Sequence, residues 1–165
     1  MSSAWVTAHT DGSATIDGVR GGWAFVLGYN GHKLIRCGCI RPGKGGKVTS
    51  NQMEMQAAIK ALQKVRSGSL IALYSDSQYL VFGMTDKDRK RNANKNLWQA
   101  LEDVCAQHKQ VIWNWIPRDQ NAEADKAAKS ALGGKTLDVR TKDGQRKSPV
   151  RRTIYHPDLA KADPG

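Results

Sequence analysis

The chain has 165 residues, of which 26 are Lys or Arg and 15 are Asp or Glu, so its formal net charge is +11. This length suits one ordinary domain with a core of its own, and the excess of positive charge indicates a polyanionic partner, with nucleic acid as the first candidate. No segment resembles a signal peptide, a membrane span or a basic amphipathic helix with a large apolar face, so we expect a cytoplasmic monomer that does not bind membranes. Cys37 and Cys39 are too close in one strand to bridge easily, which fits a reducing compartment.

The first part of the chain has the pattern of an antiparallel meander of three strands. Residues 5–11 alternate between two faces, as a half-buried strand does. After a glycine-rich loop, residues 23–29 and 33–40 are rich in β-forming side chains, and Asn30-Gly31 between them is a strong hairpin signal.

The rest of the chain alternates between helical and strand patterns. Asn51 can cap a helix with Glu54 three residues later, and an apolar stripe at helical spacing follows. Residues 70–74 read as a buried strand that is parallel to its neighbour, because the chain returns through a helix. The remaining segments are a helix at 78–84, a helix at 97–105, a strand at 111–116 and an alanine-rich helix from 121 to 132. The predicted order is βββαβαβα, with the middle helix open to division into two pieces.

Four acidic residues each lie where a predicted strand ends or a helix begins: Asp11, Glu54, Asp76 and Asp125. Any one of them alone is more often a cap or a solvated surface acid. Four carboxylates that converge on one point repel one another, so a fold would hardly gather them unless divalent cations were bound there. The pattern therefore indicates a metal-dependent nuclease.

Six short stretches occur in a fixed order between residues 4 and 132. They are Thr10-Asp11-Gly12-Ser13, Thr49-Ser50-Asn51-Gln52-Met53-Glu54, Ser75-Asp76-Ser77-Gln78-Tyr79, Leu97-Trp98-Gln99, Trp113-Asn114-Trp115 and Asn121-Ala122-Glu123-Ala124-Asp125. Each is weak alone, but in order and spacing the set resembles the ribonuclease H type 1 family. The resemblance implies an α/β, RNase H-like fold with a mixed five-stranded sheet and helices on both faces. It also implies a hydrolase that cuts the RNA strand of an RNA:DNA hybrid and leaves 5′-phosphate and 3′-hydroxyl ends.

The resemblance further implies which residues serve this reaction. Two Mg2+ ions, or Mn2+ in their place, would be bound by the four acids, with Asp11 bridging both ions. The positions that match contacts to RNA 2′-hydroxyls are the backbone at Gly12 and Ser13 and the side chains of Asn51 and Gln78. Thr49 matches a threonine that commonly binds a phosphate of the DNA strand.

The sequence departs from the family pattern in two places. Asp17 and Ser50 stand where asparagine is common, which leaves the grip on the DNA strand open and keeps double-stranded RNA as a further substrate. The loop before Asp125 carries no histidine, although many members have one there. Arg118 is the natural substitute, because it can hold a phosphate oxygen or help to release the product, although it cannot act as a base.

Two basic segments lie outside these motifs. Arg89, Lys90 and Arg91 belong to residues 87–95, which resemble a shortened form of the family's basic protrusion and would either follow a nucleic-acid backbone or form a solvated helix end. Residues 133–165 hold eight Lys or Arg against four Asp. We therefore expect a catalytic domain over 1–132 and a basic tail over 133–165 that is mobile or docked. The apolar residues available for docking are Val150, Ile154, Tyr155 and Leu159.

Two other functions compete with the ribonuclease. A proofreading-type exonuclease also gathers four acids on a related fold, but it begins with Asp-x-Glu, whereas this chain reads Asp11-Gly12-Ser13. A catalytically weak nucleic-acid-binding module of a replication or reverse-transcription complex would lack at least one carboxylate. All four are present here, so an active enzyme is the favoured interpretation.

Overall fold

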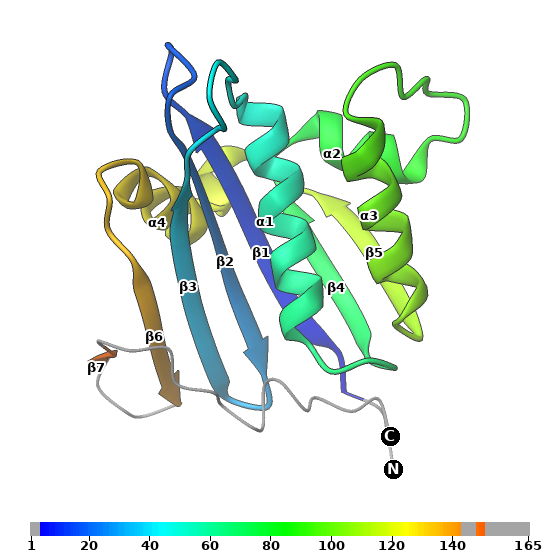
Figure 1. Cartoon of the computed structure of the whole chain (residues 1–165). Helices are drawn as coiled ribbons and strands as arrows, with labels where there is room; N and C mark the ends of the chain where they lie inside the picture. Colours follow the sequence, from blue (N-terminus) through cyan, green and yellow to red (C-terminus); the bar gives the residue numbers. More distant parts are fainter. Residues whose placement is uncertain (1–3, 143–147, 151–165) are drawn as a thin grey trace.

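The computed structural model describes residues 4–142 and 148–150, and the strands of this part form one mixed sheet in the order β5-β4-β1-β2-β3-β6-β7 (Figure 1). The strands are β1 (Val6–Ala14), β2 (Gly21–Tyr29), β3 (His32–Ile40), β4 (Leu70–Ser75), β5 (Gln110–Trp115), β6 (Leu137–Lys142) and β7 (Ser148–Val150). β1, β2 and β3 form the predicted antiparallel meander, and β4 and β5 run parallel to β1. The predicted α/β fold with a mixed sheet is confirmed.

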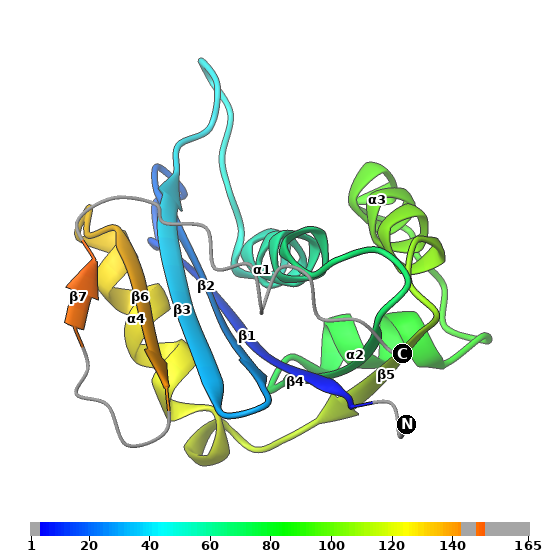
Figure 2. The same cartoon turned by 90° about the horizontal axis from the view of Figure 1, so that it is seen from below.

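The helices cover both faces of this sheet. They are α1 (Ser50–Lys64), α2 (Gln78–Thr85), α3 (Lys95–Ala106) and α4 (Ala122–Leu132), with a short 3-10 helix, η1 (Arg118–Gln120), before α4. α1 and α3 lie on one side and α4 on the other (Figure 2). The middle helix is divided into α2 and α3, as the sequence allowed. No helix in the described part of the chain is long and apolar enough to cross a membrane.

Each face of the sheet has its own core. Leucine, isoleucine, methionine and aromatic side chains fill the space under α1 and α3. On the opposite face, the alanines of α4 pack on β2 and β3. These alanines are Ala124, Ala127, Ala128 and Ala131, none of them more than 4% exposed. Because alanine is small, α4 lies close to the sheet and carries its first turn to the middle of β1.

The start of α1 differs from the prediction. Thr49, not Asn51, is the N-cap: its Oγ1 accepts from the backbone N of Gln52 at 3.1 Å, and its own backbone N donates to Gln52 Oε1 at 3.1 Å. This capping box satisfies two free donors of the first turn. Asn51 lies inside the helix, so the prediction that it caps α1 is wrong, and its side chain lines a surface cavity instead.

Two strands from beyond Gly133 extend the five strands that the resemblance implied. β6 pairs antiparallel with β3, and an ion pair joins Arg36 Nη2 to Asp138 Oδ2 at 3.1 Å across these strands. β7 pairs with β6 in turn. Ile154, Tyr155 and Leu159 lie outside the described residues, and a division of the chain at residue 133 stays a prediction.

Candidate active site

Three of the four predicted carboxylates meet at one edge of the sheet. Asp11 and Asp76 each follow the last residue pair that joins β1 to β4, Thr10 and Ser75, and Glu54 comes from the start of α1. One ligand oxygen from each of the three acids lies within 4.8 Å of the others. Asp125, in the first turn of α4, lines the same cavity of about 320 Å³.

Glu54 is held by β1 and β4 through both of its oxygens. The backbone N of Gly12 donates to Glu54 Oε1 at 3.0 Å, and the hydroxyl of Ser75 donates to Oε2 at 3.4 Å. α1 approaches β1 so closely here that a Cβ on Gly12 would lie 2.2 Å from the backbone carbon of Met53. A glycine at position 12 is therefore what lets the helix deliver Glu54 beside Asp11.

Asp76 is positioned through its backbone rather than its carboxylate. The indole Nε1 of Trp115 donates to the Asp76 carbonyl at 3.1 Å, and the backbone N of Ser77 donates to Ser75 Oγ at 3.0 Å. Asp76 Oδ2 is buried without a hydrogen-bond partner in the described part of the chain. The nearest cation is Arg118, whose Nε lies 3.8 Å from this oxygen on a side chain that is 77% exposed.

Asp125 has different surroundings. Its Oδ2 lies 3.0 Å from Nζ of Lys129, one turn later on α4, and the lysine side chain is 61% exposed. The helix itself is fixed by Asn121, which is 1% exposed and donates from Nδ2 to the carbonyl of Thr10 at 2.9 Å. This buried bond connects the start of α4 to the strand that carries Asp11.

The electrostatics of the cavity favour a bound cation. Burial raises the pKa of Glu54 to about 7, and burial followed by the proximity of Glu54 raises the pKa of Asp11. Burial also raises the pKa of Asp76, although the charge of Arg118 opposes this. Ionised together, the three groups would repel one another in a desolvated space. Carboxylate oxygens are hard ligands, and Asp76 Oδ2 still lacks a hydrogen bond, so the donor set fits Mg2+ or Mn2+.

The residues expected to contact RNA lie around the carboxylates. Ser13, Asn51 and Gln78 line the cavity. The amide of Gly12 donates to Glu54, and Ser13 pairs with Gly22 in the antiparallel ladder of β1 and β2, so the side chains of Ser13, Asn51 and Gln78 are the groups nearest to a ligand. Asp17, whose charge was expected to disturb a phosphate, accepts from Thr15 Oγ1 at 2.7 Å and from the backbone N of Val19 at 3.2 Å, so its carboxylate is bound within its own turn.

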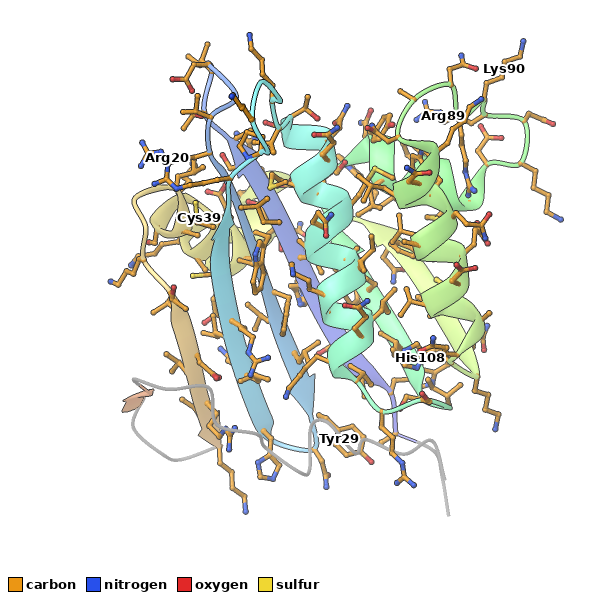
Figure 3. The ribbon with its side chains drawn as sticks, in the orientation of Figure 1. Arg20, Tyr29, Cys39, Arg89, Lys90 and His108 are labelled. Atoms are coloured by element: carbon orange, nitrogen blue, oxygen red, sulfur yellow. The ribbon has the colours of Figure 1, made fainter. Side chains whose placement is uncertain are left out.

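The three basic residues of the predicted protrusion are separated by the structure. Arg89 and Lys90 are exposed on the loop between α2 and α3 (Figure 3). Arg91 turns inward, where its Nη2 donates to Gly83 O and to Glu102 Oε1, both at 2.8 Å. Its guanidinium also lies 4.8 Å from the centre of the Trp98 ring. Arg91 thus anchors the loop. Arg89 is exposed, but its Nη1 donates to Gln78 O at 3.5 Å and its guanidinium lies 5.6 Å from the centre of the Phe82 ring, whereas Lys90 extends into solvent.

Ser75, Asn121 and Lys129 are site residues to which the sequence alone assigned no role, although Ser75 and Asn121 lie within the quoted motifs. The spacing of Asp125 and Lys129, four residues apart on a helix, was a readable signal of an ion pair. The bond from Ser75 to Glu54 joins residues 21 apart, and the bond from Asn121 to Thr10 joins residues 111 apart, so no local sequence pattern could predict them.

Comparison with known proteins gives the same family as these motifs. The family model for RNase H matches residues 3–133. Ribonuclease H of Bartonella tribocorum is 35% identical over 143 residues, covering 77% of this chain and 88% of that protein. Ribonuclease H of Maricaulis maris is 33% identical over 146 residues, covering 77% and 93%. The chain belongs to the RNase H family of hydrolases. It is an enzyme of the ribonuclease H type.

Solved structures agree on the fold. LC11-RNase H1 in complex with an RNA/DNA hybrid superposes with a TM-score of 0.65 at 22% identity, over 78% of this chain and 97% of that one. RNase H1 from the halophilic archaeon Halobacterium salinarum gives a TM-score of 0.64 at 24% identity, over 79% and 98%. At such identities the likeness concerns the arrangement of the backbone.

Proposed function

We propose that this protein hydrolyses the RNA strand of RNA:DNA hybrids with two divalent metal ions, leaving 5′-phosphate and 3′-hydroxyl ends. The observation that carries the proposal is the convergence of Asp11, Glu54 and Asp76 within 4.8 Å, with Asp125 in the same cavity. The relatives named ribonuclease H support the reaction, and the complex of LC11-RNase H1 with an RNA/DNA hybrid supports the substrate.

The four carboxylates divide into two sets in this proposal. Asp11 would be shared by both ions, Glu54 and Asp76 would complete the first site, and Asp125 would contribute to the second. Bound ions would activate a water and neutralise charge on the phosphate and on the departing 3′-oxygen. The task of the chain itself is to hold the acids at fixed positions, and the bonds from Gly12 and Ser75 to Glu54 do this without supplying a competing cation.

Recognition of RNA rests on groups beside the carboxylates. Ser13, Asn51 and Gln78 line the cavity and can bond to 2′-hydroxyls, which DNA lacks. Thr49 would bind a phosphate of the DNA strand. Its hydroxyl accepts from Gln52 in the capping box but keeps its own hydrogen to donate, so capping and phosphate binding are compatible.

Arg118 would hold an oxygen of the cleaved phosphate or of the product. Its side chain is largely exposed, and its nearest carboxylate is 3.8 Å away, so it is not committed to a close ion pair. A guanidinium offers a planar pair of donors to a phosphate and keeps its charge at neutral pH.

The test is cleavage of end-labelled RNA:DNA hybrid, double-stranded RNA and duplex DNA side by side, with Mg2+, with Mn2+ and with a chelator. We expect metal-dependent cleavage of the hybrid RNA strand and none of duplex DNA. The matched control is Asp76→Asn, which should abolish cleavage while metal-free binding of the hybrid persists. Comparable rates on double-stranded RNA would establish the broader substrate range, and an inactive wild type that binds hybrid would favour a binding module.

A further inference from the structure

The turn between β1 and β2 exposes apolar side chains beside the proposed site. Ile16 is 109% exposed and Val19 is 48% exposed, more than any other large apolar residue in the described part of the chain. The turn, residues 15–20, follows β1 directly after the segment that carries Asp11, Gly12 and Ser13. We call it the apolar tip.

The apolar tip is firmly built. The backbone N of Thr15 donates to Arg20 O, and the backbone N of Gly18 donates to Thr15 O, both at 2.9 Å. The exposed Asp17 side chain closes the turn by accepting from Thr15 Oγ1 and from the backbone N of Val19. Exposure of the two aliphatic side chains is therefore a property of an ordered turn, not of a loose loop.

A second loop braces the tip against the start of α1. The backbone N of Val48 donates to Gly18 O at 3.0 Å, and Gly18 has a positive φ of 74° with Lys47 and Val48 packed against it. Val48 immediately precedes Thr49, the cap of α1. In Figure 1 both loops rise from the same edge of the sheet as the start of α1. The tip is therefore fixed relative to the cavity wall that holds Asn51 and Glu54.

We propose that Ile16 and Val19 pack against sugar rings in the minor groove of the bound duplex, and this rests on the proposed function. The 2′-hydroxyls of an A-like duplex face its wide, shallow minor groove, so the groups that bind them must face that groove as well. Ser13 is one of these groups, and the tip continues the same strand only a few residues further. Arg20, at the base of the tip (Figure 3), would offer a cation to a phosphate at the border of that groove. The carboxylate of Asp17 is exposed, with its Oδ1 held by Thr15 and Val19 within the turn, and the charge of Arg20 offsets it at the base of the tip.

Apolar contact has a signature that separates it from phosphate contact. Neutralising phosphates releases counterions and makes binding depend on salt, whereas burial of aliphatic surface does not. Because Ile16 is fully exposed and Val19 is about half exposed in the free protein, their replacement removes little buried contact. Replacement of the two apolar side chains should thus weaken substrate binding, while the salt dependence of binding and the melting temperature of the protein stay unchanged.

The experiment compares the wild type with a double variant, Ile16→Ser with Val19→Ser, on the same labelled hybrid. We expect KM to rise about 5- to 20-fold, the effect of partly burying two aliphatic side chains, with kcat within about twofold. The slope of log KM against log salt and the melting temperature should stay unchanged. Ile112→Ser is the matched control, because this isoleucine is 40% exposed on β5 and does not line the cavity.

Binding gives a readout that does not depend on cleavage. In an Asp76→Asn background with chelator, the dissociation constant of the hybrid from fluorescence anisotropy should rise by the same factor when the tip is replaced. Unchanged KM and dissociation constant would overturn the proposal and leave the tip as a surface for a protein partner. A reduced salt slope would also overturn it, since the contact would then be electrostatic. Failure of the wild type to cleave hybrid would instead count against the proposed function alone.

Discussion

The two sides of the carboxylate cavity are built differently. On the α1 side, Glu54 is 7% exposed and is held by uncharged donors, the Gly12 amide and the Ser75 hydroxyl. On the α4 side, Asp125 pairs with Lys129, and Arg118 stands near Asp76, with both basic side chains mostly exposed. The α1 side holds its acid by hydrogen bonds within the fold. The α4 side places solvent-exposed basic side chains next to its acids.

This difference separates two tasks. Hydrogen bonds from buried neutral donors fix the position of a carboxylate and leave its charge for a metal ion. Exposed ion pairs contribute little to stability, about 0 to 1 kcal/mol, so Arg118 and Lys129 can exchange a carboxylate for a phosphate at small cost. We infer that the α1 side sets geometry and the α4 side handles the substrate's charge.

The largest expected effect comes from breaking the α1 side with Gly12→Ala. The added Cβ would lie 2.2 to 2.5 Å from backbone atoms of Met53 and Glu54, so α1 must move away from β1. We expect activity to fall by more than about 100-fold and stability by roughly 1 to 3 kcal/mol, as for an overpacked core. Steady-state rates and thermal unfolding would measure this.

The matched control is Gly43→Ala in the loop before α1, where nothing lies within 4 Å of an added Cβ. It should keep wild-type rates and melting temperature. If Gly12→Ala also behaved like the wild type, the close approach of α1 to β1 would not be what positions Glu54.

A smaller effect is expected on the α4 side from Arg118→Ala. Turnover should slow by roughly 10- to 1000-fold without ending, while the melting temperature stays within about 1 °C, because metal ions supply the main charge stabilisation and the side chain is exposed. Arg118→Lys should recover part of the rate, since it keeps the charge but loses the paired donors. The rate should not change with pH where an imidazole would titrate. Wild-type rates for the alanine variant in single-turnover and steady-state assays would make Arg118 an ordinary surface residue.

The stability of the metal-free protein should depend on pH, because the pKa values of the buried acids on the α1 side are raised. The pKa of Glu54 is raised to about 7, so the folded protein retains a proton that the unfolded chain releases near pH 4. The stabilisation that this retained proton gives to the folded state is fully present below about pH 4 and is lost as the pH rises through about 7. In chelator, the melting temperature should fall by roughly 2 to 6 °C between pH 5.5 and 7.5, and Mg2+ should reverse the fall. A rise over the same interval would mean that the folded protein already compensates these charges.

Much of this organisation could be predicted from the sequence, because short motifs encode it. Strand alternation and the Asn30-Gly31 turn predicted the antiparallel meander. The ordered motifs predicted both the fold and the site residues Asp11, Glu54 and Asp76. The cap of α1 was assigned wrongly because Thr49 and Asn51 both suit a capping position, and the side chain of Gln52 decides between them. The bond from Asn121 to Thr10 and the inward turn of Arg91 depend on contacts between distant segments, which no periodicity reveals.

The smallest effect is expected from removing positive charge on the loop between α2 and α3, which lies outside the cavity. Arg89 and Lys90 are exposed, so replacing both with Gln should leave kcat and the melting temperature unchanged and raise KM about two- to fivefold. The salt slope should fall by up to about two, because each phosphate contact contributes about one. Lys109→Gln, just before β5 and at the opposite end of the sheet from Asp76, is the matched control.

Arg91→Gln should instead lower the melting temperature, because this residue bonds Gly83 and Glu102. An unchanged salt slope for the double variant would remove the loop from the substrate interface. A reduced slope here, beside an unchanged slope for the apolar tip, would assign phosphate contact to one side of the cleft and sugar contact to the other.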